Sequence, residues 1–154
     1  NHCPYVKAII DRLIIDLGKL KKNEVNTVAI SSNDANSFPE DSYENMQQIS
    51  RLKRFNFPYL YDVTQDVAMN YKAICTPDFF GFNANLELQY RGRFDSSGRG
   101  EAQENNTHDL LNAMRLVADS QLGPTEQFHS VGCSIKWKKS GSLAGPGSGR
   151  VRRR

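Results

Sequence analysis

The 154-residue sequence lacks long hydrophobic runs and has only three cysteines. No stretch approaches the roughly 18 consecutive apolar residues that a membrane span needs, so the sequence contains no membrane-spanning helix. The cysteines, Cys3, Cys75 and Cys133, are too few and too far apart for a disulfide-stapled scaffold. No pair of them has the spacing of metal ligands, and no metal site is predicted.

An excess of basic over acidic residues is also lacking outside the end of the chain. The formal net charge is +3, but no acidic residue follows Glu126, and four arginines crowd the last five positions: Arg150, Arg152, Arg153 and Arg154. The domain itself is therefore close to neutral, and nucleic-acid binding is not expected of it. The Ser- and Gly-rich residues 140–154 are expected to form a disordered tail. A solvated extension is favoured there over an arm for nucleic acid or a membrane surface.

The remaining residues, 1–139, read as one α/β domain. Helices are predicted over residues 4–20, 38–54, 64–71 and 107–121, and strands over 25–31, 57–62, 78–82 and 86–93. A helix separates the first two strands, which predicts a parallel crossover. A short turn joins the last two, which predicts an antiparallel hairpin. A mixed central sheet with helices on both faces follows.

The first chemical feature is Cys3, immediately before Pro4. Pro4 suits the first position of a helix, where its missing N–H costs nothing. Apolar residues then recur at helical steps of three and four: Val6, Ile9, Ile10, Leu13, Ile14, Leu17 and Leu20. Cys3 would thus lie at the helix N-terminus, where unpaired N–H groups and the helix dipole favour a thiolate. A half-buried, unreactive cysteine at this position is the alternative.

The second feature is Thr76-Pro77, just before a hydrophobic strand. Proline cannot donate to a sheet ladder, so it belongs at a strand start or in a cis turn. A cis Thr–Pro bond would direct the preceding backbone toward the structure opposite it.

Three stretches together resemble the thioredoxin-like superfamily, in its redoxin branch related to the peroxiredoxins (the alkyl hydroperoxide reductase/thiol-specific antioxidant group). Asn1-His2-Cys3-Pro4-Tyr5-Val6 resembles the latter part of a Cys-Asn-His-Cys-Pro-Tyr-Val active-site motif. Residues 75–80, Cys-Thr-Pro-Asp-Phe-Phe, resemble the cis-proline segment, and residues 132–138, Gly-Cys-Ser-Ile-Lys-Trp-Lys, resemble the C-terminal end. The ordered set covers residues 1 to about 139.

The sequence departs from this pattern at its start. The first cysteine of the Cys-x-x-Cys motif would precede Asn1, and so would the central strand that delivers it. With no initiator Met and an abrupt helix start, we expect the domain to be N-terminally truncated. In a dithiol cycle Cys3 would be the resolving thiol. In the peroxiredoxin alignment it is the single peroxide-attacking cysteine, which is oxidised to a sulfenate.

The resemblance also implies roles for neighbouring residues. Cys75 is the nearest second thiol in such a fold, and Cys133 is another if the C-terminal segment folds back. Either can instead be an unreactive buried cysteine, which is the favoured interpretation for Cys133. His2 could lower the pKa of Cys3 or carry a proton to a leaving thiol. The resemblance places Pro4, Thr76 and Pro77 at the substrate-binding surface.

The function that the resemblance implies is thiol–disulfide exchange or thiol-dependent peroxide reduction. The substrate would be a protein disulfide or a hydroperoxide, with electrons from an external thiol and no metal or organic cofactor. The alternative is a non-catalytic domain that binds extended peptides beside the cis proline. No nucleic-acid or membrane partner is expected, and the compartment stays open, with the cytoplasm favoured. Loss of a central strand would leave two strand edges unpaired, which predicts self-association.

Overall fold

The structure is a computed structural model that describes residues 1–101 and 103–139. The predicted tail, 140–154, lies outside the described residues. Four α-helices are present: α1 (Pro4–Lys22), α2 (Tyr43–Leu52), α3 (Asp66–Asn70) and α4 (Asp109–Ser120). A 3-10 turn, η1 (Pro39–Asp41), precedes α2. The strands are β1 (Ala29–Ser31), β2 (Tyr59–Tyr61), β3 (Phe79–Phe82) and β4 (Leu88–Gly92).

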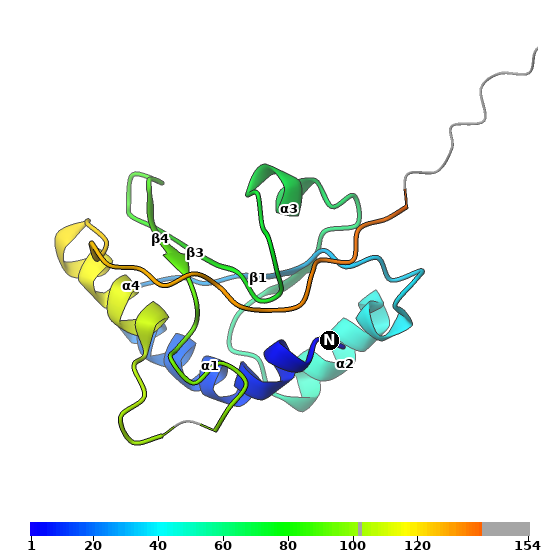
Figure 1. Ribbon diagram of the computed structural model, residues 1–154, viewed down its shortest axis with the longest axis horizontal. Helices are drawn as coiled ribbons and strands as arrows, with labels where there is room; N and C mark the ends of the chain where they lie inside the picture. Colours follow the sequence, from blue (N-terminus) through cyan, green and yellow to red (C-terminus); the bar gives the residue numbers. More distant parts are fainter. Residues whose placement is uncertain (102, 140–154) are drawn as a thin grey trace, which may run out of the picture.

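The predicted order of helices and strands is confirmed, and so are both strand pairings. β1 pairs with β2 in parallel, and β3 pairs with β4 antiparallel, with an irregularity between Gly81 and Phe82. The predicted single sheet is present as two two-stranded ribbons. Among the described residues no strand bridges β1 and β3, so β1 and β3 each keep a backbone edge that no strand pairs with. In Figure 1, α1 and α4 lie on one side of the strands and α3 on the other.

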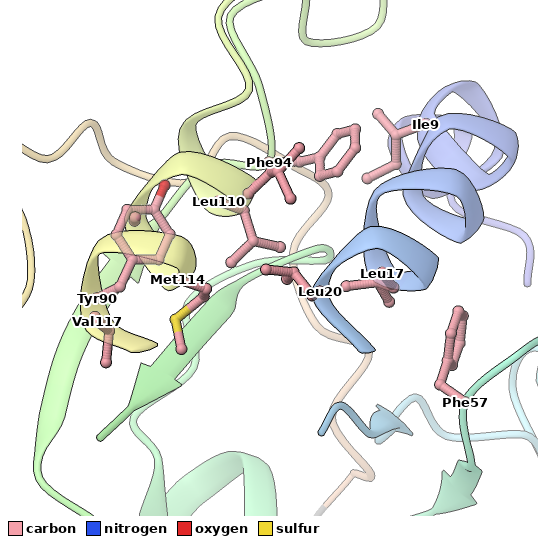
Figure 2. Close-up of a cluster of buried hydrophobic side chains, with 11 residues drawn as sticks. Ile9, Leu17, Leu20, Phe57, Tyr90, Phe94, Leu110, Met114 and Val117 are labelled. Atoms are coloured by element: carbon pink, nitrogen blue, oxygen red, sulfur yellow. The ribbon is translucent and has the colours of Figure 1, made fainter. Parts of the chain in front are cut away.

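The core lies where α4 covers β4 and packs against α1. Figure 2 shows apolar side chains of α1 and α4 directed toward one another above the β3–β4 ribbon. They belong to one buried cluster: Ile9, Leu17, Leu20, Phe57, Tyr90, Phe94, Leu110, Leu111, Ala113, Met114 and Val117. Leu20 and Tyr90 are only 1% and 2% exposed. Burial of this kind contributes about 25 cal/mol for each Å² of apolar surface removed from water, and it fixes α1 in place.

A groove of about 1370 Å³ runs between the two ribbons. Its walls are mainly apolar and include Leu13, Val25, Ile30, Phe79 and Met114. Ile30, on β1, is 41% exposed, as expected of a strand that lacks a neighbour on one side. Cys3, at the start of α1, also lies in its lining. No helix of the described residues is long and apolar enough to cross a bilayer.

Candidate active site

Cys3 occupies the N-cap position of α1, with Pro4 in the first turn as predicted. The first helical hydrogen bond runs from the Lys7 N–H to the Cys3 carbonyl (3.0 Å). The Cys3 side chain is buried, at 1% exposure, and its Sγ lies 3.1 Å from the Thr76 carbonyl oxygen. A 19-residue helix thus directs the positive end of its dipole at this sulfur.

The surroundings of Cys3 favour its thiolate. Burial acts to raise the pKa of Cys3, but hydrogen bonds from the Thr76 side chain and the Cys133 thiol oppose it. The backbone amides of Val6 and Cys133 add to them, and the net result is a pKa below the ordinary value of 9.0. A buried thiol with a lowered pKa is the environment of a reactive cysteine rather than of an inert one.

The Thr76–Pro77 peptide bond is cis, and both residues line the groove beside Cys3. Thr76 contacts the Cys3 sulfur through its carbonyl oxygen. The chain segment before β3 is therefore held against the N-terminus of α1. Of the residues assigned to the substrate-binding surface, Thr76 and Pro77 lie in the groove lining, and Pro4 opens the helix next to them.

Cys75 is also buried but has different neighbours. Its Sγ lies 3.4 Å from the Pro77 carbonyl oxygen. Burial, followed by the negative charge of Asp78, raises the pKa of Cys75 to about 11. At neutral pH it is a protonated thiol with little nucleophilic character.

His2 lies against Asp41 rather than against the sulfur. Its Nδ1 is hydrogen-bonded to the Asp41 carboxylate, and its ring stacks on Phe38 with centroids 4.9 Å apart. Asp41 is fully buried and also accepts a hydrogen bond from the Asn33 amide (2.8 Å). The His2 backbone N–H also donates to this carboxylate (3.1 Å).

The sequence did not predict Asp41 as a residue of this site. It lies 39 residues from His2, and its position in the sequence marks only an acidic helix start. No spacing signal links it to the start of α1.

Cys133 lies close to Cys3, although the sequence favoured its interpretation as an unreactive buried thiol. It is half-buried, and its backbone forms an isolated antiparallel bridge with Thr76. Its thiol forms a hydrogen bond with Cys3, which raises the pKa of Cys133, as burial also does. The signal for this proximity is the resemblance of residues 132–138 to a family segment. Periodicity gives none, because the segment is irregular.

No group of three His, Cys, Asp or Glu side chains within residues 1–101 and 103–139 is arranged to hold a metal ion. Cys3 and Cys133 lie on either side of the Thr76 carbonyl, next to a cis proline and an apolar groove. Such an arrangement can support the chemistry of sulfur nucleophiles.

Comparison with known proteins agrees with this geometry. A model of the AhpC/TSA family matches residues 1–94. An uncharacterized conserved protein from Geobacillus kaustophilus has a similar crystal structure, with a TM-score of 0.85 and 41% identity over 91% of this chain and 74% of its own. A hypothetical protein from Sinorhizobium meliloti 1021 gives a TM-score of 0.84 and 38% identity, over 90% of this chain and 75% of its own. No curated protein matches the chain.

The family match covers more than half of the sequence, including Cys3 and the Thr76–Pro77 segment. It confirms the predicted thioredoxin-like fold, and it supports a redox or peroxidase function of the general kind that this fold carries. The chain belongs to the AhpC/TSA family, within the redoxin and peroxiredoxin-like part of the thioredoxin superfamily.

Proposed function

We propose that this chain is a thiol-dependent reductase that acts on hydroperoxides or disulfides through Cys3, with electrons returned by an external thiol. The observation that carries the proposal is the environment of the Cys3 sulfur. It is buried at the N-terminus of α1, and the donors around it lower the pKa of Cys3 despite that burial. Helix dipole and hydrogen bonds stabilise negative charge on sulfur, and the thiolate is the nucleophile in such reactions.

With a hydroperoxide the Cys3 thiolate attacks one oxygen of the O–O bond. The bond breaks, Cys3 becomes a sulfenic acid, and the other oxygen leaves as an alcohol or water after taking up a proton. The sulfur loses the two electrons that the peroxide gains. With a disulfide the same thiolate displaces one sulfur and forms a mixed disulfide. In both cases thiols restore the reduced enzyme.

The groove reaches the region of this sulfur, because Cys3, Thr76 and Pro77 lie in its lining. The Cys3 side chain is only 1% exposed, which favours small oxidants over bulky ones.

The test is to trap the oxidised sulfur. The reduced chain is treated with one equivalent of hydrogen peroxide in the presence of dimedone, and the adducts are located by mass spectrometry. Dimedone on Cys3, lost in Cys3→Ser and retained in Cys75→Ser and Cys133→Ser, supports the proposal. No peroxide consumption and no reaction of Cys3 with an aromatic disulfide at neutral pH would refute it.

A second candidate is a non-catalytic binding domain, favoured by the open groove and the free edges of β1 and β3. The occupant we propose is a second copy of this chain, because a free strand edge pairs readily with its like. Sedimentation over a range of concentrations tests this, with Ile30→Lys on the exposed β1 edge as the variant and Leu122→Lys as the control. Association weakened only by Ile30→Lys supports the proposal, whereas a concentration-independent monomer counts against it.

A further inference from the structure

The C-terminal segment of residues 128–138, here called the strap, returns across the molecule after α4 and passes the cis proline (Figure 1). The strap has no regular secondary structure, but hydrogen bonds hold its residues that precede Cys133. The Phe128 carbonyl accepts from the Arg93 N–H (3.0 Å). Ser130 Oγ lies 2.7 Å from an Asp78 carboxylate oxygen and 2.6 Å from the Gly92 carbonyl oxygen.

The residues of the strap that follow Cys133 are held by two buried amide side chains. Asn33 accepts from the Lys136 N–H (2.9 Å), and Gln65 donates to the Lys136 carbonyl (2.9 Å) and accepts from the Lys138 N–H (2.8 Å). Asn33 and Gln65 are 6% and 4% exposed. Buried amides of this kind fix a register, because a partner left unpaired would lose its hydrogen bonds to water without replacement. The position of Cys133 along the strap is therefore set from both ends.

Between these anchors the strap pairs with the residue before the cis proline. The Thr76 N–H donates to the Cys133 carbonyl (2.8 Å), and the Cys133 N–H donates to the Thr76 carbonyl (3.0 Å). The same Thr76 oxygen lies 3.1 Å from the Cys3 sulfur. A Cβ added at Gly132 would collide with the Thr76 carbonyl, so glycine is what allows this close approach.

This pairing brings the Cys3 thiol and the Cys133 backbone N–H onto one carbonyl oxygen, that of Thr76. The interaction between the two thiols lowers the pKa of Cys3 and raises the pKa of Cys133, so Cys3 is the more acidic of the two. A protonated thiol held beside a more acidic one by this backbone pairing is placed to attack that sulfur once it is oxidised, after its proton moves to the leaving group. Cys75, by contrast, directs its sulfur at the Pro77 carbonyl.

We propose that Cys133 is the resolving cysteine of this site, which forms an intramolecular disulfide with Cys3. The inference rests on the proposed function for the first step, the oxidation of Cys3. When Cys3 is a sulfenic acid, the Cys133 sulfur attacks it, the S–O bond breaks, and the oxygen leaves as water with the Cys133 proton. When Cys3 carries a mixed disulfide, the same attack expels the substrate thiol. An external thiol then reduces the disulfide with two electrons.

The strap also bears on which oxidants reach Cys3. Both backbone hydrogen-bonding groups of Thr76 are paired with Cys133. An extended peptide could pair with Thr76 only by displacing the strap and its anchors. Cys133 thus occupies the position in which an external peptide would pair with Thr76. Small oxidants are therefore the favoured substrates.

The sequence permits a direct test. Trypsin cleavage after Lys7, Lys72, Arg91, Arg115 and Lys136 places each cysteine on a different peptide. The reduced chain is oxidised with one equivalent of hydrogen peroxide or, separately, of diamide, a two-electron dithiol oxidant. Free thiols are then alkylated, the monomer is isolated on a non-reducing gel, and disulfide-linked peptides are identified by mass spectrometry. Wild type and Cys75→Ser should both give a link between peptides 1–7 and 116–136.

Cys133→Ser and Cys133→Ala should lose this link and accumulate dimedone-reactive Cys3, with circular dichroism as the check on folding. A link between peptides 1–7 and 73–91 in wild type would overturn the proposal. So would free Cys133 beside an accumulated Cys3 sulfenate. If neither peroxide nor an aromatic disulfide reacts with Cys3 but diamide gives the 1–7/116–136 link, the proposed function fails while the pairing stands. Failure of diamide to give that link would refute the pairing itself.

Discussion

Cys3 and Cys75 are buried on the two sides of Thr76, yet their surroundings shift their pKa values in opposite directions. Burial raises the pKa of both thiols. Cys3 has compensating partners in the Thr76 side chain, the Cys133 thiol and the first turn of α1. Cys75 instead faces the negative charge of Asp78. Burial alone therefore does not decide the reactivity of these two thiols. The hydrogen-bond donors and charges around each sulfur decide it.

Replacement of the activated thiol should have the largest effect. With a pKa of about 11, only about 10⁻⁴ of Cys75 is thiolate at pH 7. Cys3→Ser should therefore slow peroxide-driven thiol loss by about 100-fold or more, measured with a thiol-specific dye. Cys75→Ser is the matched control and should stay near the wild-type rate. An equal decrease in the rate of thiol loss in the two variants would show that Cys3 is no more reactive than Cys75.

Removal of the negative charge beside Cys75 should bring the pKa of Cys75 closer to that of Cys3. Asp78→Asn keeps the shape of the side chain but removes the charge that raises the pKa of Cys75. Burial remains, so the pKa should fall only part of the way, and Cys75 alkylation at pH 8 should rise by up to about tenfold. Cys3 alkylation in the same chain, read from its own tryptic peptide, shows whether the strap has loosened, because Asp78 also holds Ser130. An unchanged Cys75 rate would show that burial alone sets its pKa.

A displaced strap should weaken the activation of Cys3. Gly132→Ala adds a Cβ against the Thr76 carbonyl, which should cost about 1–3 kcal/mol of stability and loosen the Cys133 contacts. The pKa of Cys3 should then rise toward its ordinary value, and its alkylation at pH 7 should slow by about threefold. Ser134→Ala, on an exposed neighbour, should match wild type in both stability and rate.

The smallest change is expected from His2. Its ring is committed to Asp41 and Phe38, so His2→Ala should leave the pH profile of Cys3 alkylation unchanged. Loss of the contacts to Asp41 should lower the free energy of unfolding by about 1–3 kcal/mol, measured by urea denaturation. A shift of the Cys3 profile in this variant would instead make His2 a direct modulator of the sulfur, as the sequence had suggested.

The sequence predicted the elements well where periodicity and proline set them. The apolar spacing from Val6 to Leu20 and the Cys3-Pro4 start placed α1 almost to its ends, which are Pro4 and Lys22. The expected helix over residues 38–54 is interrupted at Ser42, whose side chain accepts from the Asn45 N–H and begins α2 after the 3-10 turn. The strand expected over 25–31 pairs only at Ala29–Ser31, where β2 lies alongside.

The candidate site was predictable only in part. Cys3 and the Thr76–Pro77 segment could be placed because local signals, a helix start and a pre-strand proline, mark them. The Cys133 contact depends on an irregular strap that pairs with Thr76 across 57 residues, and no local pattern encodes such a pairing. The same holds for Asp41 and His2, which meet only through the fold.

The central claim is tested most directly by the pH dependence of alkylation at Cys3 and Cys75 in one wild-type sample. Isotope-coded iodoacetamide and the separate tryptic peptides give both rates at each pH. The rate at Cys3 should level off at a pH below the ordinary thiol pKa of 9.0, and the rate at Cys75 should still be rising toward a pKa of about 11. Two profiles with the same midpoint, or a Cys3 midpoint above that of Cys75, would contradict the account.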